Sequence, residues 1–165
     1  ALAILTVRGI PTIIVAIPLL IMLGWLGLRD THIGLILAYV ALTVPFAFWM
    51  LKSFVDDVPH EIEEAAMMDG MSRWQAHFRV TLPLIKGGVV ATALFIFILN
   101  WSEFLLAVVL TEKTVVTMPI NMFLYSGVFG IQAALATVAA LPIVVVGLLI
   151  HKHLARGFTL GAVKR

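Results

Sequence analysis

The side chains that could make chemical contacts are concentrated in residues 59–83, PHEIEEAAMMDGMSRWQAHFRVTLP. This segment carries the carboxylates Glu61, Glu63, Glu64 and Asp69 within a sequence that is otherwise almost continuously apolar. A chain that places so many polar residues in one internal segment is expected to use it to contact something in water. The segment is therefore the first candidate for function.

A second polar pair lies inside an apolar run, at Asn100 and Glu103. Because an unpaired carboxylate inside a membrane costs several kcal/mol, Glu103 is a candidate functional residue. We place it about five turns into a helix, toward its outer half. The alternative is a carboxylate near the surface that reaches lipid headgroups or a neighbouring helix, and the sequence leaves both interpretations open.

Metal and thiol chemistry have little support in the sequence. The chain has no cysteine, which excludes disulfides and thiolate metal sites. His151 and His153 are two residues apart, so on a helix they lie on different faces and suit an interfacial anchor rather than a metal site. We expect no catalytic residue and no metal ligand.

The elements that must position these residues are membrane helices. Hydrophobic residues make up 62% of the chain and charged residues 12%, against about 25% charged in soluble domains. A helix needs about 20 apolar residues to cross a bilayer. We predict spans at about 10–28, 33–54, 88–110 and 133–150. Uninterrupted runs of this kind exclude barrel strands and predict an all-α integral membrane protein.

The basic residues lie mainly on one side of these spans. Only Arg29 and Lys113 fall opposite the following nine: Arg8, Lys52, Arg73, Arg79, Lys86, Lys152, Arg156, Lys164 and Arg165. By the positive-inside rule, residues 59–83 and the C-terminus are cytoplasmic. This distribution argues against nucleic-acid binding, despite a net charge of +2.

Local signals divide residues 59–83 into two short helices. Pro59 suits a helix N-terminus, and Asp69-Gly70 suits a stop. Ser72 could cap a second helix that runs to about Val80 and is stopped by Pro83.

Three further local features are predicted. Asp30 or Thr31 is expected to cap the second span, and Pro18 and Pro45 are expected to kink the helices that contain them. The Pro45 kink either is an ordinary feature of membrane helices or shapes a translocation path.

Apolar side chains recur at helical spacing along the same segment. Met67, Met71, Trp74 and Phe78 would share one face if the helix direction survives Gly70. Such a face could pack on the helix bundle, lie in the lipid interface or dock a partner, and its periodicity does not decide between these.

The spacing of the segment matches a known motif. Glu64-Ala65-Ala66 is followed after three residues by Gly70, and after nine more by Val80-Thr81-Leu82-Pro83. This arrangement between two spans resembles the EAA loop of permease subunits of binding-protein-dependent ABC importers, with Val80 in place of the usual isoleucine.

Other segments resemble the maltose-type group of carbohydrate-importer permeases, and in particular its smaller subunit. These segments are Leu28-Arg29-Asp30-Thr31 with Gly34-Leu35, Pro45-Phe46, Glu63-Glu64-Ala65-Ala66 with Asp69-Gly70, Trp101-Ser102-Glu103-Phe104 and Gly161-Ala162-Val163-Lys164. Ser102 replaces the usual asparagine. The resemblance covers essentially the whole chain and implies a type I importer permease core, with one or two further N-terminal spans before residue 1.

The resemblance implies a coupling role for residues 59–83. In this family a short cytoplasmic helix sits in a cleft of an ATP-hydrolysing subunit. Glu64 would make polar contacts there, while Ala65, Ala66 and Gly70 permit close approach. A carboxylate at this place can pair with arginine through two hydrogen bonds. The implied coupling set also includes Asp69, Leu82 and Pro83.

The resemblance also implies partners. They are a pair of ATP-binding cassette subunits that use ATP and Mg²⁺, a second permease subunit forming a heterodimer, an extracytoplasmic solute-binding protein and membrane lipid. This chain has no G-x-x-x-x-G-K-[ST] phosphate loop and is expected to bind no cofactor itself. Residues 111–132 would face the binding protein, and residues 157–164 would approach the ATPase pair.

The implied location is the inner membrane of a prokaryotic cell, with a cytoplasmic C-terminus. Asn100 and Glu103 become candidates for the sugar translocation path. The alternatives are a permease for a non-sugar solute, an ion-coupled secondary carrier and an intramembrane enzyme. The last two would need more polar residues within the spans than these two.

Overall fold

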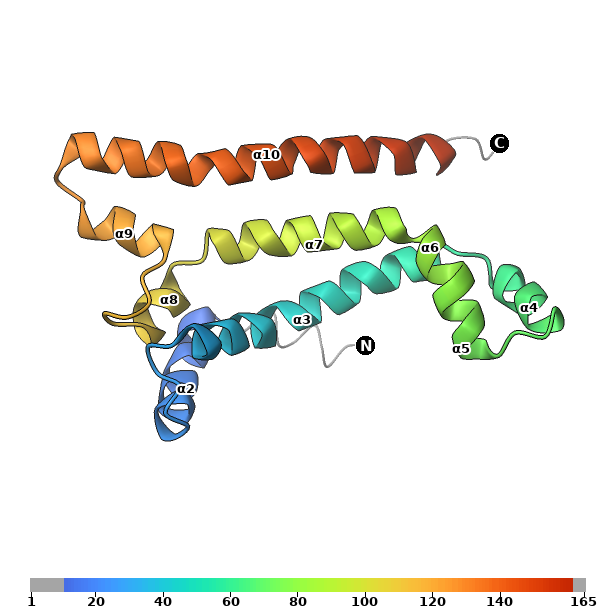
Figure 1. The fold of residues 1–165 in the computed structure, drawn as a ribbon, viewed down its shortest axis with the longest axis horizontal. Coiled ribbons are helices and arrows are strands. Elements are labelled where there is room, and N and C mark those ends of the chain that lie inside the picture. Colours follow the sequence, from blue (N-terminus) through green and yellow to red (C-terminus); the bar gives the residue numbers. More distant parts are fainter. Residues whose placement is uncertain (1–10, 162–165) are drawn as a thin grey trace. The chain divides into compact units, whose positions relative to one another are not determined.

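The computed structural model describes residues 11–161, and the side chains of residues 11–149. All regular elements in this range are helices (Figure 1). In chain order they are α2 (Thr12–Trp25), α3 (His32–Asp56), α4 (His60–Met68), α5 (Arg73–Ala76), the π turn η1 (His77–Thr81), α6 (Leu82–Leu84), α7 (Lys86–Trp101), α8 (Leu105–Leu110), α9 (Met118–Leu124) and α10 (Phe129–Gly161). Pro18, Pro45 and Pro142 lie inside α2, α3 and α10, and the kinks predicted at the first two stay predictions.

Two of these helices are long and apolar enough to cross a membrane. They are α3 and the Phe129–Leu149 part of α10. The pair Arg73–Leu84 and Lys86–Trp101 would count as a third span, although it is bent by 71°. The predicted all-α integral membrane fold is confirmed, whereas the assignment of four spans stays a prediction.

The chain forms two compact units, and α3, α7 and α10 each contribute residues to both. The first unit extends up to Pro45 and includes Phe97–Val146. Its core joins α2, α3, α8 and α9 through buried side chains: Ala16, Leu23, Leu35, Ala38, Leu106, Ala107, Leu110, Val115 and Ile120. Helices α2 and α8 contact each other in this core, and because lipid is itself apolar, close packing rather than the hydrophobic effect stabilises the contact.

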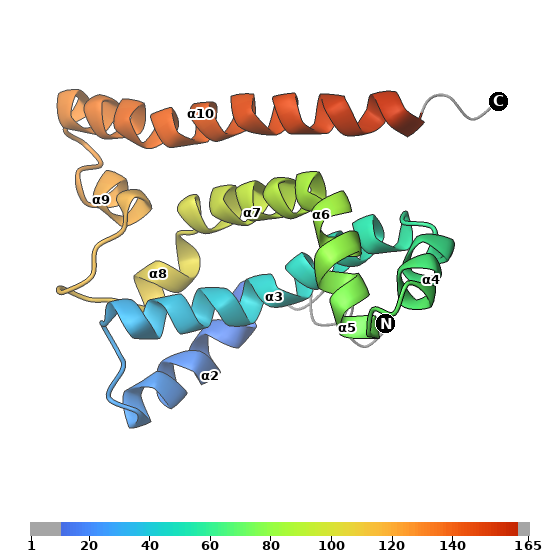
Figure 2. The ribbon, with the colours of Figure 1, turned by 45° about the vertical axis from the view of Figure 1, so that its right-hand side comes forward.

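The second unit comprises Phe46–Ile96 and the chain from Gly147 onward. Within it, α4 and the helix formed by α5, η1 and α6 are joined by a sharp turn, and we call residues 59–84 the elbow (Figure 2). The end of α3 meets the start of α7 at Gly88, where a Cβ atom would lie within 2.3–2.7 Å of the Phe54 ring. Only glycine allows this close approach.

Two predicted helix ends are wrong. Pro83 does not stop the second elbow helix, which continues to Leu84. The π turn η1 widens the helix before it, and Pro83 then lies at the start of α6, where the missing amide donor costs no hydrogen bond. The single helix predicted through Glu103 is interrupted: α7 ends at Trp101 and α8 begins at Leu105. Glu103 itself causes the new start, since its carboxylate accepts hydrogen bonds from the first amides of α8.

Candidate functional site

The elbow begins and ends where local chemistry predicts. Pro59 precedes the first turn of α4, and Glu61 and Glu63 lie in that turn, where carboxylates complement the helix dipole. The helix ends at Met68 with Asp69 as its C-cap, and Gly70 turns the chain with φ +89°, a conformation that favours glycine. The Met71 amide then donates to the Ala66 carbonyl and closes the turn.

Ser72 starts the second elbow helix with a reciprocal capping pair. Its hydroxyl accepts from the Gln75 amide at 3.3 Å, and the Gln75 side chain accepts from the Ser72 amide at 2.9 Å. This pairing satisfies two amides that helix geometry leaves unpaired. The predicted Ser72 cap is confirmed.

The EAA residues divide between the two faces of α4. Glu61, Glu64, Ala65 and Met68 follow helical spacing and are all exposed, with Met68 84% exposed. Ala66 is 7% exposed and belongs to the face that contacts α5 and η1. Ala65 is thus available to a partner, whereas Ala66 serves the packing of the elbow itself.

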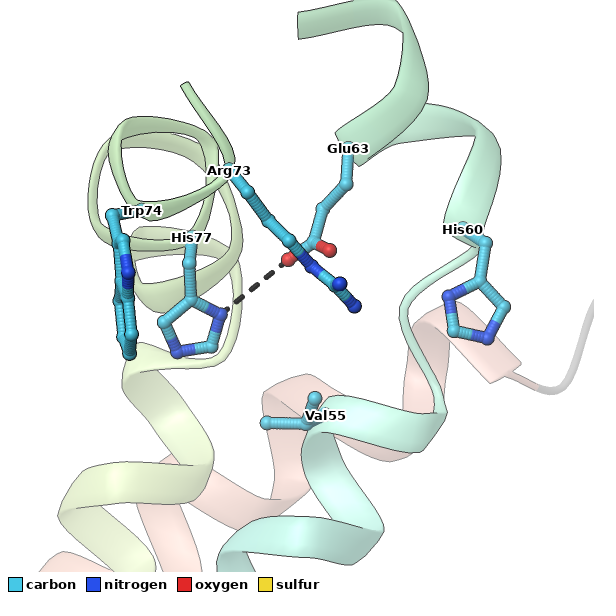
Figure 3. Close-up of a pocket in the computed structure, with 6 residues that line it drawn as sticks. All are labelled: Val55, His60, Glu63, Arg73, Trp74 and His77. Carbon is cyan, nitrogen blue, oxygen red and sulfur yellow. Dashed lines mark hydrogen bonds and ion pairs between the residues drawn. The ribbon is translucent and has the colours of Figure 1, made fainter. Parts of the chain in front are cut away.

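Glu63 connects the two arms of the elbow. Its carboxylate accepts a hydrogen bond from the Thr81 hydroxyl and lies 3.4 Å from Nδ1 of His77 (Figure 3). Thr81 is 1% exposed. The pKa of Glu63 is lowered chiefly because the Thr81 hydroxyl donates to the carboxylate, with His77 adding to the effect.

A cleft of about 590 Å³ opens beside this contact. It is lined by Val55, His60, Glu63, Arg73, Trp74 and His77. Figure 3 shows Glu63 and His77 turned toward each other across it, with His60 on the far side. Among residues 11–149 no group of three or more His, Cys, Asp or Glu side chains is placed to hold a metal.

The apolar side chains of the elbow are largely solvent-facing. Trp74 and Phe78 stack with ring centroids 6.1 Å apart, and they are 74% and 58% exposed. Met67 is also exposed, while Met71 is half-buried. This exposure favours a lipid interface or a docking partner over packing within the bundle.

The remaining coupling candidates lie at the end of α4 and in α6. Asp69 and Gly70 are exposed at the end of α4, and Leu82 and Pro83 are exposed in α6. They do not form one cluster with Glu64, which lies on the outward face of α4.

Glu103 is engaged by its own surroundings. Oε1 accepts from the Leu106 amide at 2.8 Å and Oε2 accepts from the Ala107 amide at 3.1 Å, while the Tyr39 hydroxyl donates to Oε2 at 3.2 Å. These bonds correspond to the structural alternative, a carboxylate bonded to a neighbouring helix. Asn100 is half-buried near the end of α7, and its backbone carbonyl accepts from the Glu103 amide at 3.3 Å.

Asp30 joins the turn before α3 to the loop after α8 in the first unit. It has φ 54°, and its carboxylate accepts from four successive amides, those of Glu112, Lys113, Thr114 and Val115, at 2.8–3.1 Å. These donors, the Glu112 amide foremost, hold the pKa of Asp30 well below its usual range. The predicted α3 cap is Thr31, whose hydroxyl accepts from the Gly34 amide at 3.0 Å.

Sequence reasoning missed Glu63, Thr81 and the role of Asp30. The different role of Glu63 could have been inferred in part, because adjacent residues of a helix face different sides and Glu64 faces outward. The partners of the Asp30 carboxylate are 82–85 residues away, and nothing local indicates them.

The ion pairs at Arg29 and Asp56 add little to the site. Arg29 pairs with Glu112 and Lys52 pairs with Asp56 on exposed surfaces, where such pairs contribute about 0–1 kcal/mol. The predicted interfacial anchor at His151 and His153 concerns side chains outside the described residues.

Comparison with known proteins places this architecture in a family. Residues 2–160 match the model of the binding-protein-dependent transport system inner membrane component family. A probable ABC transporter permease of Sinorhizobium fredii, y4oR, is 37% identical over 98% of this chain and 60% of its own length. The trehalose transport system permease SugB of Mycobacterium tuberculosis is 36% identical over 98% of this chain and 62% of its own length.

A third relative is the trehalose/maltose transport system permease MalG of Thermococcus litoralis, 34% identical over 86% of this chain and 52% of its own length. The chain thus spans roughly three fifths of the length of the first two of these curated relatives. The helical fold, the apolar spans and the match over residues 2–160 agree, and this chain belongs to the family of inner membrane components of binding-protein-dependent transport systems.

Proposed function

We propose that this chain is part of the membrane-spanning subunit of an ATP-driven carbohydrate importer. Its family supplies membrane components to binding-protein-dependent transport systems. Relatives named for trehalose, diacetylchitobiose and trehalose/maltose transport are 34–38% identical to it. These names favour a sugar over another solute.

The observation that carries the coupling proposal is the outward face of α4. Glu64 and Ala65 are exposed side by side, and Met68 follows one turn later. A carboxylate beside a small residue lets a second surface approach closely and pair an arginine with Glu64. The occupant proposed for this face is the ATP-binding cassette subunit, which would bind ATP and Mg²⁺ itself.

The other partners and the orientation follow from the same role. A second permease subunit would complete the transport path as a heterodimer. An extracytoplasmic solute-binding protein would contact residues 111–132. The elbow and the C-terminus would be cytoplasmic, consistent with the basic residues Lys52, Arg73 and Arg79 around the elbow. Ordered membrane lipid would cover the exposed apolar faces of α2 and α3.

Co-purification of the full-length protein with its ATPase subunits tests this function. Glu64→Arg and Gly70→Asp should each reduce complex formation and sugar-stimulated ATP hydrolysis at least tenfold. The first reverses the docking charge, and the second places a side chain at φ +89°. Asp57→Arg, a charge reversal at an exposed residue before the elbow, serves as the control. Unchanged assembly and hydrolysis in both elbow variants would exclude docking through this face.

A further inference from the structure

Glu63 has a different environment from the other carboxylates of α4. Glu61 and Glu64 are exposed, whereas Glu63 turns inward and its side chain is 23% exposed. It is the α4 carboxylate that reaches the second arm of the elbow, through the Thr81 hydroxyl. An exposed helical carboxylate would keep its hydration, so this inward orientation needs a partner that compensates for lost water.

Thr81 is that partner, and it is buried in the widened turn. Thr81 is 1% exposed, and it occupies the last position of η1. A buried hydroxyl left unpaired costs about 1–3 kcal/mol. The bond to Glu63 satisfies it and simultaneously ties α4 to the helix that continues toward α7. His77, one turn before Thr81, adds its ring nitrogen at 3.4 Å from the same carboxylate oxygen.

The buried apolar side chains of α4 and α5 are small. Ala66 from α4 and Ala76 from α5 are buried, at 7% and 0% exposed, but each supplies only a methyl group. The backbone link is Gly70, a residue with wide conformational freedom. Small apolar contacts and a glycine turn do not by themselves fix the angle between two short helices, so the polar contact has a large share in setting it.

We propose that Glu63 is a positioning residue: through Thr81 and His77 it fixes the orientation of α4 and so presents Glu64 and Ala65 to the coupling partner. Glu63 and Glu64 then have separate tasks, one directed into the elbow and one directed outward. The presentation step rests on the proposed function, whereas the orientation step concerns this chain alone.

The orientation step can be measured without any partner. Spin labels are attached to cysteines at Met68 in α4 and Arg79 in η1 of the full-length protein, both exposed positions; residues 1–165 contain no cysteine that would compete. Pulsed electron spin resonance then gives the distribution of distances between the labels. The parent and Thr81→Ser, which keeps the hydroxyl, should give one narrow distribution.

Glu63→Ala and Thr81→Val should each broaden that distribution at least twofold, and the double variant should be no broader than the singles because both remove one contact. Alanine is the best helix former, so Glu63→Ala leaves α4 intact. Thr92→Val is the matched control, since Thr92 is equally buried but its hydroxyl bonds only the Gly88 carbonyl of its own helix. Parent-like distributions in Glu63→Ala and Thr81→Val would overturn the proposal.

The presentation step is measured by titrating the corresponding unlabelled variants, which keep Met68 and Arg79, with the ATPase subunit. Thr81→Val should bind at least fivefold more weakly, and Thr81→Ser should restore parent affinity. A broadened distribution with unchanged affinity would overturn the presenting role of Glu63. If the parent itself did not bind the ATPase, the proposed function would fail, while the distance distributions would still decide whether Glu63 orients α4.

Discussion

Asp30 shows how one carboxylate can hold together segments that are distant in the sequence. It receives four amide hydrogen bonds from residues 112–115, and its own amide donates to the Leu110 carbonyl at 3.1 Å. Consecutive amides pointing at one anion form the same kind of concave site that binds phosphate in other proteins. The turn before α3 and the loop after α8 therefore behave as one unit.

Replacing this carboxylate should release the loop. In Asp30→Asn an NH₂ group replaces one carboxylate oxygen, and this group cannot accept hydrogen bonds. Because each oxygen of Asp30 accepts from two amides, at least two of the four bonds are lost. Hydrogen exchange at residues 112–115 should become at least tenfold faster. Glu112→Gln is the control: it removes only the exposed pair with Arg29 and should leave exchange near the parent rate. Equal exchange in both variants would show that Asp30 does not hold the loop.

The contact between Gly88 and Phe54 gives a second prediction at the scale of single residues. In Gly88→Ala the new methyl group would meet the base of the Phe54 ring, which cannot move without shifting α3 or α7. The expected loss is about 1–3 kcal/mol of stability, as for other overpacked sites. Thermal unfolding in detergent measures it. Adding Phe54→Ala should recover part of the loss, and a double variant less stable than both singles would contradict the steric explanation.

At the scale of elements, the turn at Gly70 reverses the chain between the two arms, whose angle also depends on the contact between Glu63 and Thr81. A residue with a Cβ atom at φ +89° costs about 1–2 kcal/mol, while asparagine tolerates the left-handed region better than alanine. Gly70→Ala should therefore lower the unfolding temperature of the full-length protein more than Gly70→Asn does. There is open space around a Cβ atom at this position, so equal effects of the two substitutions would mean that backbone conformation is not the cause.

The elements that the sequence predicts correctly are those governed by neighbouring residues. Pro59, Gly70 and Ser72 act within one helical turn, and each marks the helix end that the structure has. The breaks at Glu103 and Pro83 were not predictable in this way. Glu103 caps α8 with support from Tyr39 on another helix, and Pro83 continues the helix only because η1 precedes it. Both depend on backbone geometry or long-range contacts that hydrophobic runs do not encode.

The candidate site shows the same division. The motif Glu64-Ala65-Ala66 is readable as a spacing, but only the folded elbow separates its two faces. Ala66 packs inward while Ala65 stays exposed, and Glu63 pairs with Thr81, 18 residues away. The periodicity of Met67, Met71, Trp74 and Phe78 could not distinguish docking from packing, because this depends on which surfaces the turn at Gly70 brings together.

At the scale of the whole molecule, the large exposed apolar area is explained by a membrane. Many side chains of α2, α3 and α10 are exposed although they are aliphatic, among them Ile17, Ile36 and Leu148. Soluble monomers rarely expose contiguous apolar surface of this extent. The elbow differs, because its exposed apolar residues alternate with Glu61, Glu64 and Arg73. This mixed surface suits a protein partner at the membrane edge.

Site-specific photo-crosslinking in the assembled transporter tests the docking of the elbow most directly. A photoreactive amino acid at Met68, on the outward face of α4, should form a covalent product with the ATPase subunit. The same amino acid at Ile36, on the exposed apolar side of α3, should form none. A product at Ile36, or no product at Met68 in a complex that hydrolyses ATP, would contradict coupling through α4.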